Sequence, residues 1–285
     1  MLAVSWAGPL VRFADAPALA ISAWRLLLSV ILLAGIVLAR GTAPEIVRLD
    51  RADRALALLG GACLAAHFWT WIASLSLTSV ASSVVLVNTQ PVFVVLLSAL
   101  FLRERPSRGQ AIGIGTAMAG AFVIGWGDFG RGAAHLLGDA LALAGAVFVA
   151  AYYVVGRRLR QRLDIWNYAL VIYGIAAVLL TLVVAVHPHV TLTGYGRNDW
   201  LVFVALALGP MLIGHTGVNY ALRYIPAYVA NLALLAEPVG ATVIAWALPG
   251  IREVPSFQTI GGGAVILIGI GIGATAGRGG VRTRA

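Results

Sequence analysis

Long apolar runs, interrupted at short intervals by charged and turn residues, form the main pattern of this chain. A helix needs about 20 mostly apolar residues to cross a bilayer, and most of these runs are near that length. The predicted spans are residues 1–13, 18–39, 53–77, 80–102, 108–126, 136–157, 165–186, 199–222, 226–248 and 257–276. The first is short, because thirteen residues rise only about 20 Å as a helix.

Composition agrees with this pattern. The chain has 285 residues, of which 60% are hydrophobic and only 11% charged, whereas a soluble domain is about 25% charged. Too little polar surface remains to cover a soluble globule of this length. We therefore predict an all-α integral membrane protein whose surface contacts the lipid bilayer.

The basic residues give an orientation. All 20 are arginine and give a net charge of +9, but they cluster between apolar runs rather than along one face, so we expect no nucleic-acid partner. Fifteen lie in the even-numbered gaps and the C-terminal tail, four lie in the odd-numbered gaps (Arg12, Arg131, Arg197 and Arg252), and Arg25 lies inside the second span. By the positive-inside rule both termini of this multi-pass protein are cytoplasmic.

The chain also resembles itself when shifted by about 148 residues. His67 then matches His215, Gln90-Pro91 matches Glu237-Pro238, and RERPS (103–107) matches REVPS (252–256). Such landmarks in order indicate an internal repeat. Residues 1–130 and 131–285 would be the two halves, each with five spans. Five is an odd number, so the second half enters the membrane inverted, as in many secondary transporters.

The repeat accounts for the short first span. The matching sixth span starts near Asp139, which places the equivalent start about eight residues before Met1. Either the first helix is truly short, or the natural N-terminus lies upstream of Met1; we favour the second alternative.

Several segments resemble the drug/metabolite transporter superfamily, specifically the EamA-type ten-helix exporters. They are WRLLLSVIL (24–32), HFWTWIASLSLTSVASSVVLVNTQPVFV (67–94), GDALALAGAVFVAAYYVVGRR (138–158) and GHTGVNYALRYIPAYVANLALLAEPVGA (214–241). The resemblance implies a bacterial inner-membrane carrier with two inverted five-helix halves. It also implies a central cavity lined by the first, third, fourth, sixth, eighth and ninth helices. LPGIREVPS (248–256) departs from the family pattern, which commonly has Leu-Gly-Glu there.

The leading hypothesis is a secondary transporter that exports small metabolites, either amino acids or drug-like amines, by alternating access. It needs no cofactor, and no nucleotide-binding motif is present that would let ATP drive it. The alternative is a membrane-embedded enzyme acting on lipid or polyprenyl substrates. Such an enzyme would need a catalytic constellation, and Glu237 with two histidines is the only available material.

Glu237 is the first candidate site residue, because it lies near the middle of the ninth span. A charge at that depth costs at least about 2.5 kcal/mol, and such residues usually face a cavity or a partner. Glu237 would either couple transport to protons or bind a substrate amine, or it would act as a neutral structural acid bonded to a facing helix. Its repeat counterpart, Gln90, is not ionisable. Pro91 and Pro238 would bend their helices, with Asn88 supplying polar partners to the freed backbone.

Histidines and aromatic residues complete the predicted cavity. His67 and His215 are repeat mates, and each is followed four residues later on the same helix face by Trp71 or Asn219. Each histidine either lines the cavity or only bonds a neighbouring helix. No third ligand supports a metal site. We add three aromatic residues to the predicted cavity: Tyr152, Tyr220 and, through its repeat match, Trp6.

Arg25 and the glycines each leave two alternatives open. Arg25 lies about eight residues into the second span; it either extends to the membrane interface or meets a buried partner such as a substrate carboxylate. The fifth and tenth spans are rich in closely spaced glycines, including Gly269-x-x-x-Gly273. Those two spans form either a tight scaffold or the surface of a homodimer.

Overall fold

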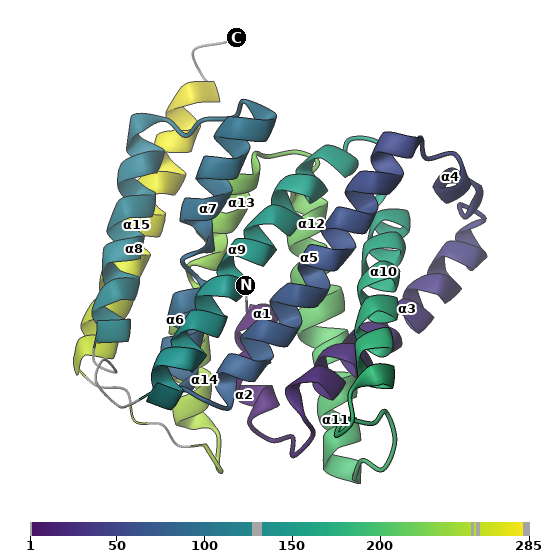
Figure 1. The fold of residues 1–285 in the computed structure, drawn as a ribbon. Helices are drawn as coiled ribbons and strands as arrows, with labels where there is room; N and C mark the ends of the chain where they lie inside the picture. The colour runs from purple at the N-terminus through teal and green to yellow at the C-terminus, as the bar shows by residue number, and fades with distance from the viewer. Residues whose placement is uncertain (1, 127–132, 252–253, 255–256, 282–285) are drawn as a thin grey trace.

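The chain folds into helices throughout the described residues (Figure 1). The computed structural model describes residues 2–126, 133–251, 254 and 257–281. The elements up to residue 126 are α1 (Leu2–Ser5), α2 (Ala7–Val11), α3 (Ala18–Arg40), α4 (Pro44–Val47), α5 (Arg51–Leu75), α6 (Val80–Val87), α7 (Gln90–Leu97), the π-helix η1 (Ser98–Leu102) and α8 (Arg108–Trp126). Those that follow are α9 (Ala133–Leu159), α10 (Ile165–Val186), α11 (Arg197–Leu206), the π-helix η2 (Ala207–His215), α12 (Thr216–Ala221), α13 (Ala227–Leu234), α14 (Glu237–Ala247) and α15 (Phe257–Val281).

Seven helical stretches of the described residues are long and apolar enough to cross a membrane, and two shorter apolar ones, Leu2–Val11 and Ile260–Ala276, accompany them. The protein is therefore an all-α membrane protein. Its helix boundaries follow the predicted spans to within a few residues, because charged and turn residues end the apolar runs. The predicted border at residues 130 and 131 and most of the REVPS loop lie outside the described residues.

Two helical stretches are interrupted at their centres, each just before a proline. Between α6 and α7 the break falls at Asn88 and Thr89, and between α13 and α14 it falls at Leu235 and Ala236. Pro91 has no N–H and cannot bond the carbonyl four residues earlier. Local side chains bond the ends of α6 instead: Asn88 Nδ2 donates to Val84 O at 2.8 Å, and Thr89 Oγ1 donates to Leu86 O at 2.7 Å.

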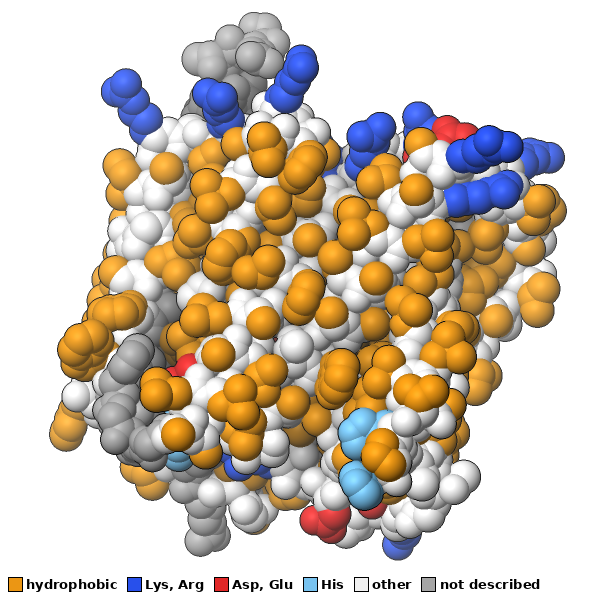
Figure 2. All heavy atoms as spheres, in the orientation of Figure 1, with side chains coloured by type: hydrophobic (Ala, Val, Ile, Leu, Met, Phe, Trp, Pro, Cys, Tyr) orange, Lys and Arg blue, Asp and Glu red, His pale blue; other side chains and the backbone are white. Residues whose placement is uncertain are grey.

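Arginine side chains gather at one end of the molecule (Figure 2). We call it the arginine-rich end: there α3 ends, α5 and α8 begin, and α9 ends. A broad hydrophobic belt separates it from the opposite end, called the far end below, where Figure 2 shows histidine and acidic side chains. A bilayer would surround this belt.

Helices that match in the sequence repeat run in opposite directions (Figure 1). The pair α6 and α7 rises toward the arginine-rich end, whereas α13 and α14 descend from it. Likewise α8 begins at that end and α15 finishes there. Elements of the two halves also interleave, since α5 packs along α9 and α10 packs along α3.

The glycine-rich helices α8 and α15 lie side by side along their length (Figure 1). A Cβ atom added at Gly113 would be 2.5 Å from the backbone nitrogen of Gly273, and one at Gly269 would be 2.4 Å from that of Ala117. The absence of side chains thus lets the two backbones touch. Of the two alternatives left by the sequence, the described helices show a scaffold inside one chain.

Gly113→Ala should therefore destabilise the fold. The methyl group would collide with the backbone of α15, which cannot rotate away, and over-packing of this kind costs about 1–3 kcal/mol. We expect a lower apparent melting temperature in detergent. Gly115→Ala is the matched control, because nothing lies within 4 Å of its Cβ position. Equal melting temperatures for the two variants would contradict the assigned packing.

Candidate functional site

A small cavity lies at the centre of the molecule, between the two halves. Its walls come from α1, α2, α5, the α6–α7 break, α9, η2 and the α13–α14 break. These are the helices that the resemblance implied. Its volume is 20 Å³, room for about one water molecule. The polar or aromatic lining residues are His67, Trp71, Gln90, Tyr153, His215 and Glu237.

Glu237 is the first residue of α14, directly after the α13–α14 break, and is buried. Its Oε2 accepts a hydrogen bond from Asn88 Nδ2 at 3.3 Å, so the two breaks meet through their polar side chains. Ser5 Oγ on α1 donates to the backbone oxygen of Glu237 at 3.4 Å. Among the described residues, Glu237 is the one acidic side chain that lines this cavity, and the opposite half of the chain holds it.

His67 has a defined tautomer. Its Nδ1 lies 2.9 Å from the carbonyl oxygen of Gly145, and since a carbonyl only accepts, Nδ1 carries the proton. The imidazole stacks parallel to the Trp71 ring, 6.1 Å between centroids. A Cβ atom at Gly145 would be 3.3 Å from Trp71 Cβ, so glycine allows α9 this close.

His215 belongs to a second polar group. Its Nδ1 lies 3.3 Å from the Tyr153 hydroxyl, and the two rings stack. Behind it, the side-chain amide of Asn219 donates to the Tyr152 hydroxyl and, at 3.4 Å, to that of Tyr173. Tyr152 and Asn219 therefore support the cavity wall from behind and do not line the cavity.

Two further predicted residues do not reach the cavity, and Asn88 lies beside it without lining it. Tyr220 is 52% exposed and its ring lies against Tyr224, because it projects from the outer face of α12. Trp6 is 41% exposed and sits at the junction of α1 and α2. The sequence placed both in spans that contribute to the cavity but did not fix which way each side chain points.

Two free polar groups remain beside the cavity. The indole N–H of Trp71 and the side-chain oxygen of Asn88 have no hydrogen-bond partner among the described residues, although both are buried. Buried polar atoms are usually paired. The site therefore offers one unused donor and one unused acceptor, in addition to the Glu237 carboxyl group.

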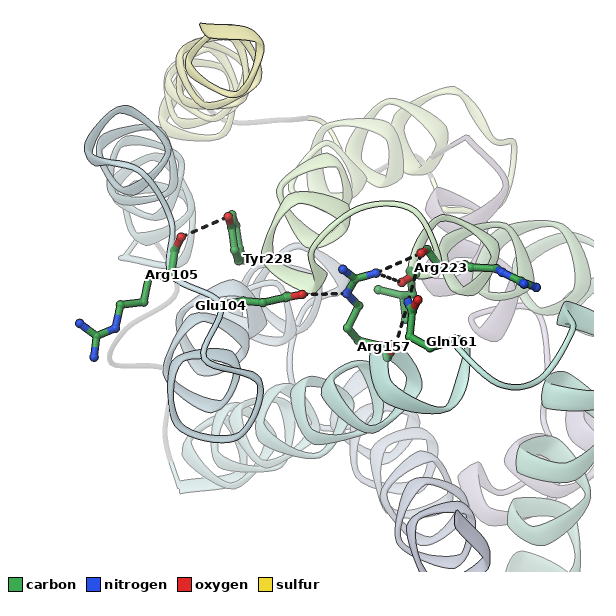
Figure 3. Close-up of polar contacts among 7 residues, drawn as sticks. Glu104, Arg105, Arg157, Gln161, Arg223 and Tyr228 are labelled. Carbon is green, nitrogen blue, oxygen red and sulfur yellow. Dashed lines mark hydrogen bonds and ion pairs between the residues drawn. The ribbon is translucent and has the colours of Figure 1, made fainter. Parts of the chain in front are cut away.

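At the arginine-rich end, polar contacts join neighbouring helices and loops (Figure 3). Arg157 lies one helical turn above Tyr153, and its Nε pairs with Glu104 Oε1 at 2.9 Å. Its Nη1 donates to the backbone oxygens of Leu222 at 2.6 Å and Arg223 at 3.2 Å. These bonds tie α9 to the loop before α8 and to the loop after α12.

A second contact in Figure 3 crosses between the halves at the same end: the Tyr228 hydroxyl donates to Arg105 O at 3.2 Å. Nearby, Arg162 pairs with Asp50 at 2.8 Å and Asp53 at 2.5 Å. Hydrogen bonds from the Asp53 backbone N–H and from Arg162 lower the pKa of the Asp50 carboxyl group. The two halves are thus joined at several points around this end.

The far end is also joined across the halves. Asp199 Oδ1 on α11 accepts from the backbone N–H groups of Asp15 at 2.9 Å and Ala16 at 3.1 Å. Trp24 Nε1 on α3 donates to Leu192 O at 3.0 Å. The two halves are thus joined by polar contacts at both ends of the molecule.

A larger groove of 870 Å³ lies outside this cavity, between η2, α12, α13 and α15. Among the described residues, its lining consists of apolar side chains and glycine, including Leu2, Ile213 and Ile225. It offers no group for acid–base or ionic chemistry. The described residues also contain no cluster of three or more His, Cys, Asp or Glu side chains that could hold a metal ion.

Comparison with known proteins identifies the family. The EamA-like transporter family model matches residues 1–126 and again residues 136–273. An uncharacterized transporter of Archaeoglobus fulgidus is 27% identical over 208 residues, 72% of this chain and 71% of its own. A probable terminal-alkyne amino-acid exporter of Streptantibioticus cattleyicolor is 31% identical over 188 residues, 65% of this chain and 61% of its own.

A crystal structure of a protein that is 22% identical superposes with a TM-score of 0.77, covering 100% of this chain and 96% of its own. At that identity the likeness shows the fold alone. The two family matches cover most of the sequence, and this family comprises transporters and not enzymes. The chain belongs to the EamA-like transporter family of the drug/metabolite transporter superfamily, with two EamA domains.

Proposed function

We propose that this protein is a secondary carrier that exports small metabolites, amino acids or drug-like amines, across the bacterial inner membrane by alternating access. Family membership supports transport, and the exporter of Streptantibioticus cattleyicolor supports the amino-acid class. The observation that carries the proposal is the central cavity, which holds buried polar groups between two halves that are joined at both ends. Releasing one set of end contacts at a time would open the cavity to one side and then to the other.

The proposed architecture is ten transmembrane helices in two inverted halves of five, residues 1–130 and 131–285. The opposite directions of matching helices and the two separate family matches support it. Halves of similar fold can exchange inward-open and outward-open shapes at similar energy. The arginine-rich end would face the cytoplasm, with both termini, by the positive-inside rule.

Glu237 is the proposed coupling group. Its carboxyl group lines the cavity and is bonded by Asn88 of the other half. A proton or a substrate amine that binds there would alter this contact between the halves. Intramembrane carboxyl groups that face a cavity commonly serve in proton relays.

Counterflow in proteoliposomes tests transport directly. Vesicles that contain the protein are loaded with one unlabelled amino acid or amine at a time and should accumulate the same labelled compound transiently. For at least one compound, this accumulation should be severalfold higher than in vesicles without the protein. A compound that binds the folded carrier should also raise its melting temperature. If no amino acid or amine of a broad panel is exchanged or raises the melting temperature, the proposed substrate class is wrong.

A further inference from the structure

Arg25 is a buried cation that the chain leaves largely unpaired. It lies on α3 and has no exposed surface, so it does not extend to the membrane interface. Its Nε and Nη1 have no hydrogen-bond partner among the described residues. Its Nη2 reaches only the Met211 sulfur, at 3.9 Å, which is a weak acceptor. The guanidinium carbon lies 4.0 Å from the centroid of the Phe68 ring.

Arg160 shows how the same chain satisfies another buried arginine. It is only 1% exposed, and its Nε donates to Asn219 O at 3.1 Å while its Nη1 donates to Leu163 O. Backbone carbonyls therefore serve Arg160 as fixed partners. Arg25 has no equivalent, although an uncompensated charge at membrane depth is costly and is usually kept for function.

The aromatic rings of Phe68 and His215 separate Arg25 from the central cavity. The Phe68 ring beneath its guanidinium group meets the His215 ring edge-on, at 5.2 Å between centroids, and His215 lines the cavity. Since the cavity has room for about one water, any metabolite must displace part of its lining. Displacement of these two rings would expose the guanidinium group.

The wall at this point is suited to move. It is η2, a nine-residue π-helix that contains Pro210 and ends at His215. Its Met211 sulfur lies 3.9 Å from the Arg25 Nη2 group. π-helical segments inside longer helices are uncommon and occur frequently at functional sites.

We propose that Arg25 is the group that binds the carboxylate of the transported molecule, which makes amino acids preferred substrates over the corresponding amines; the inference rests on the proposed function. A guanidinium group offers two parallel donors to a carboxylate, a strong and oriented pairing. Glu237 lies at the wall formed by α14 and α6, whereas Arg25 contacts α5 and η2. A zwitterion would use both groups.

Stability distinguishes a ligand-binding arginine from a structural one. Arg25→Met removes a buried charge that the chain does not pair, so the variant should melt at the same temperature as the parent or higher. Arg160→Met should melt at a lower temperature, because the carbonyls of Asn219 and Leu163 lose their donors. A loss of stability in Arg25→Met as large as that in Arg160→Met would overturn the proposal.

Transport supplies the second measurement. Each standard amino acid and the amine made by removing its carboxyl group are compared by counterflow with the parent, Arg25→Lys and Arg25→Met. In Arg25→Met the ratio of kcat/KM for the acid to that for its amine should fall at least tenfold, and Arg25→Lys should lie between. An unchanged ratio overturns the carboxylate role of Arg25 while leaving the proposed function intact. If the parent exchanges neither class, the proposed function itself fails.

Pairing of Arg25 with Glu237 within the chain is the competing explanation, and the same data test it. An internal ion pair predicts that Arg25→Met and Glu237→Gln reduce transport of acids and amines in equal proportion. That result would also overturn the proposal.

Discussion

Transport by the Glu237→Gln variant is expected to lose its dependence on pH. Glutamine keeps the size of the side chain and its bond with Asn88, but it cannot take up or release a proton. The rate of counterflow, measured in steps of pH with the same pH on both sides, should become flat. The parent should vary over the same range. A pH profile in Glu237→Gln that matches the parent would exclude Glu237 as the coupling group.

The repeat offers a matched control for this variant. Gln90 lines the same cavity from the opposite half, so Gln90→Glu combined with Glu237→Gln moves the carboxyl group without changing composition. Return of pH dependence in the double variant would show that transport needs a carboxyl group in the cavity, but that either half of the chain can supply it. His67, His215 and Tyr153 also face the cavity and Arg25 lies behind it. If transport by both variants still depends on pH, His67 or His215 would be the group responsible for that dependence.

Arg157→Ala is expected to weaken closure at the arginine-rich end. It removes the ion pair with Glu104 and the bonds to the carbonyls of Leu222 and Arg223. Hydrogen bonds of charged groups contribute roughly 1.5–3 kcal/mol each, and about 1.4 kcal/mol changes an equilibrium tenfold. We expect the fraction of molecules whose cavity is open to this end to be at least tenfold larger in Arg157→Ala than in the parent.

Thiol labelling measures that opening. The single native cysteine, Cys63, is replaced by alanine, and Val149→Cys places a thiol in the cavity wall. A membrane-impermeant maleimide added from the arginine-rich side should label this thiol at least tenfold faster in Arg157→Ala. Arg158→Ala is the control, since Arg158 is an exposed neighbour. Equal labelling rates for the two arginine variants would show that the Arg157 contacts do not hold the end closed.

The helix boundaries could be predicted from the sequence because charges and prolines are rare within the apolar runs. Arg40, Arg51, Arg108 and Arg157 each lie at or near the end of a helix, since a charged group is too costly to place deeper. The two breaks were foreseeable for a related reason. Proline removes a backbone bond, and the polar residues beside Pro91 indicate where that bond is replaced.

Side-chain directions could not be predicted in the same way. In a soluble helix the polar face points to water, but here the outer face is as apolar as the core, so the pattern does not distinguish them. Tyr220 and Asn219 are adjacent in sequence, yet one is exposed and the other fully buried. For the same reason the apolar pattern does not reveal the contact between Tyr173 and Thr216, whose hydroxyl groups are 3.0 Å apart.

The location of Arg25 and the extent of η2 could not be predicted from the sequence, for different reasons. The position of Arg25 near a helix end allowed either an interface or a buried location, and only the packing of Phe68 and Met211 around it decides between them. For η2, Pro210 indicates a disturbed helix. It does not say that the disturbance spreads over nine residues as a π-helix, which depends on the packing of the neighbouring helices.

The backbone contact between α8 and α15 has a consequence for the path of opening. One helix comes from each half, and at Gly113 and Gly269 they touch without intervening side chains that could slide. This edge of the molecule, at the left of Figure 1, would act as a spine on which the halves turn. The opposite edge, with α3, α10 and α11, would then move farthest, because it lies farthest from the contact between α8 and α15. Distances between paired spin labels should stay constant along the spine and change most at α11.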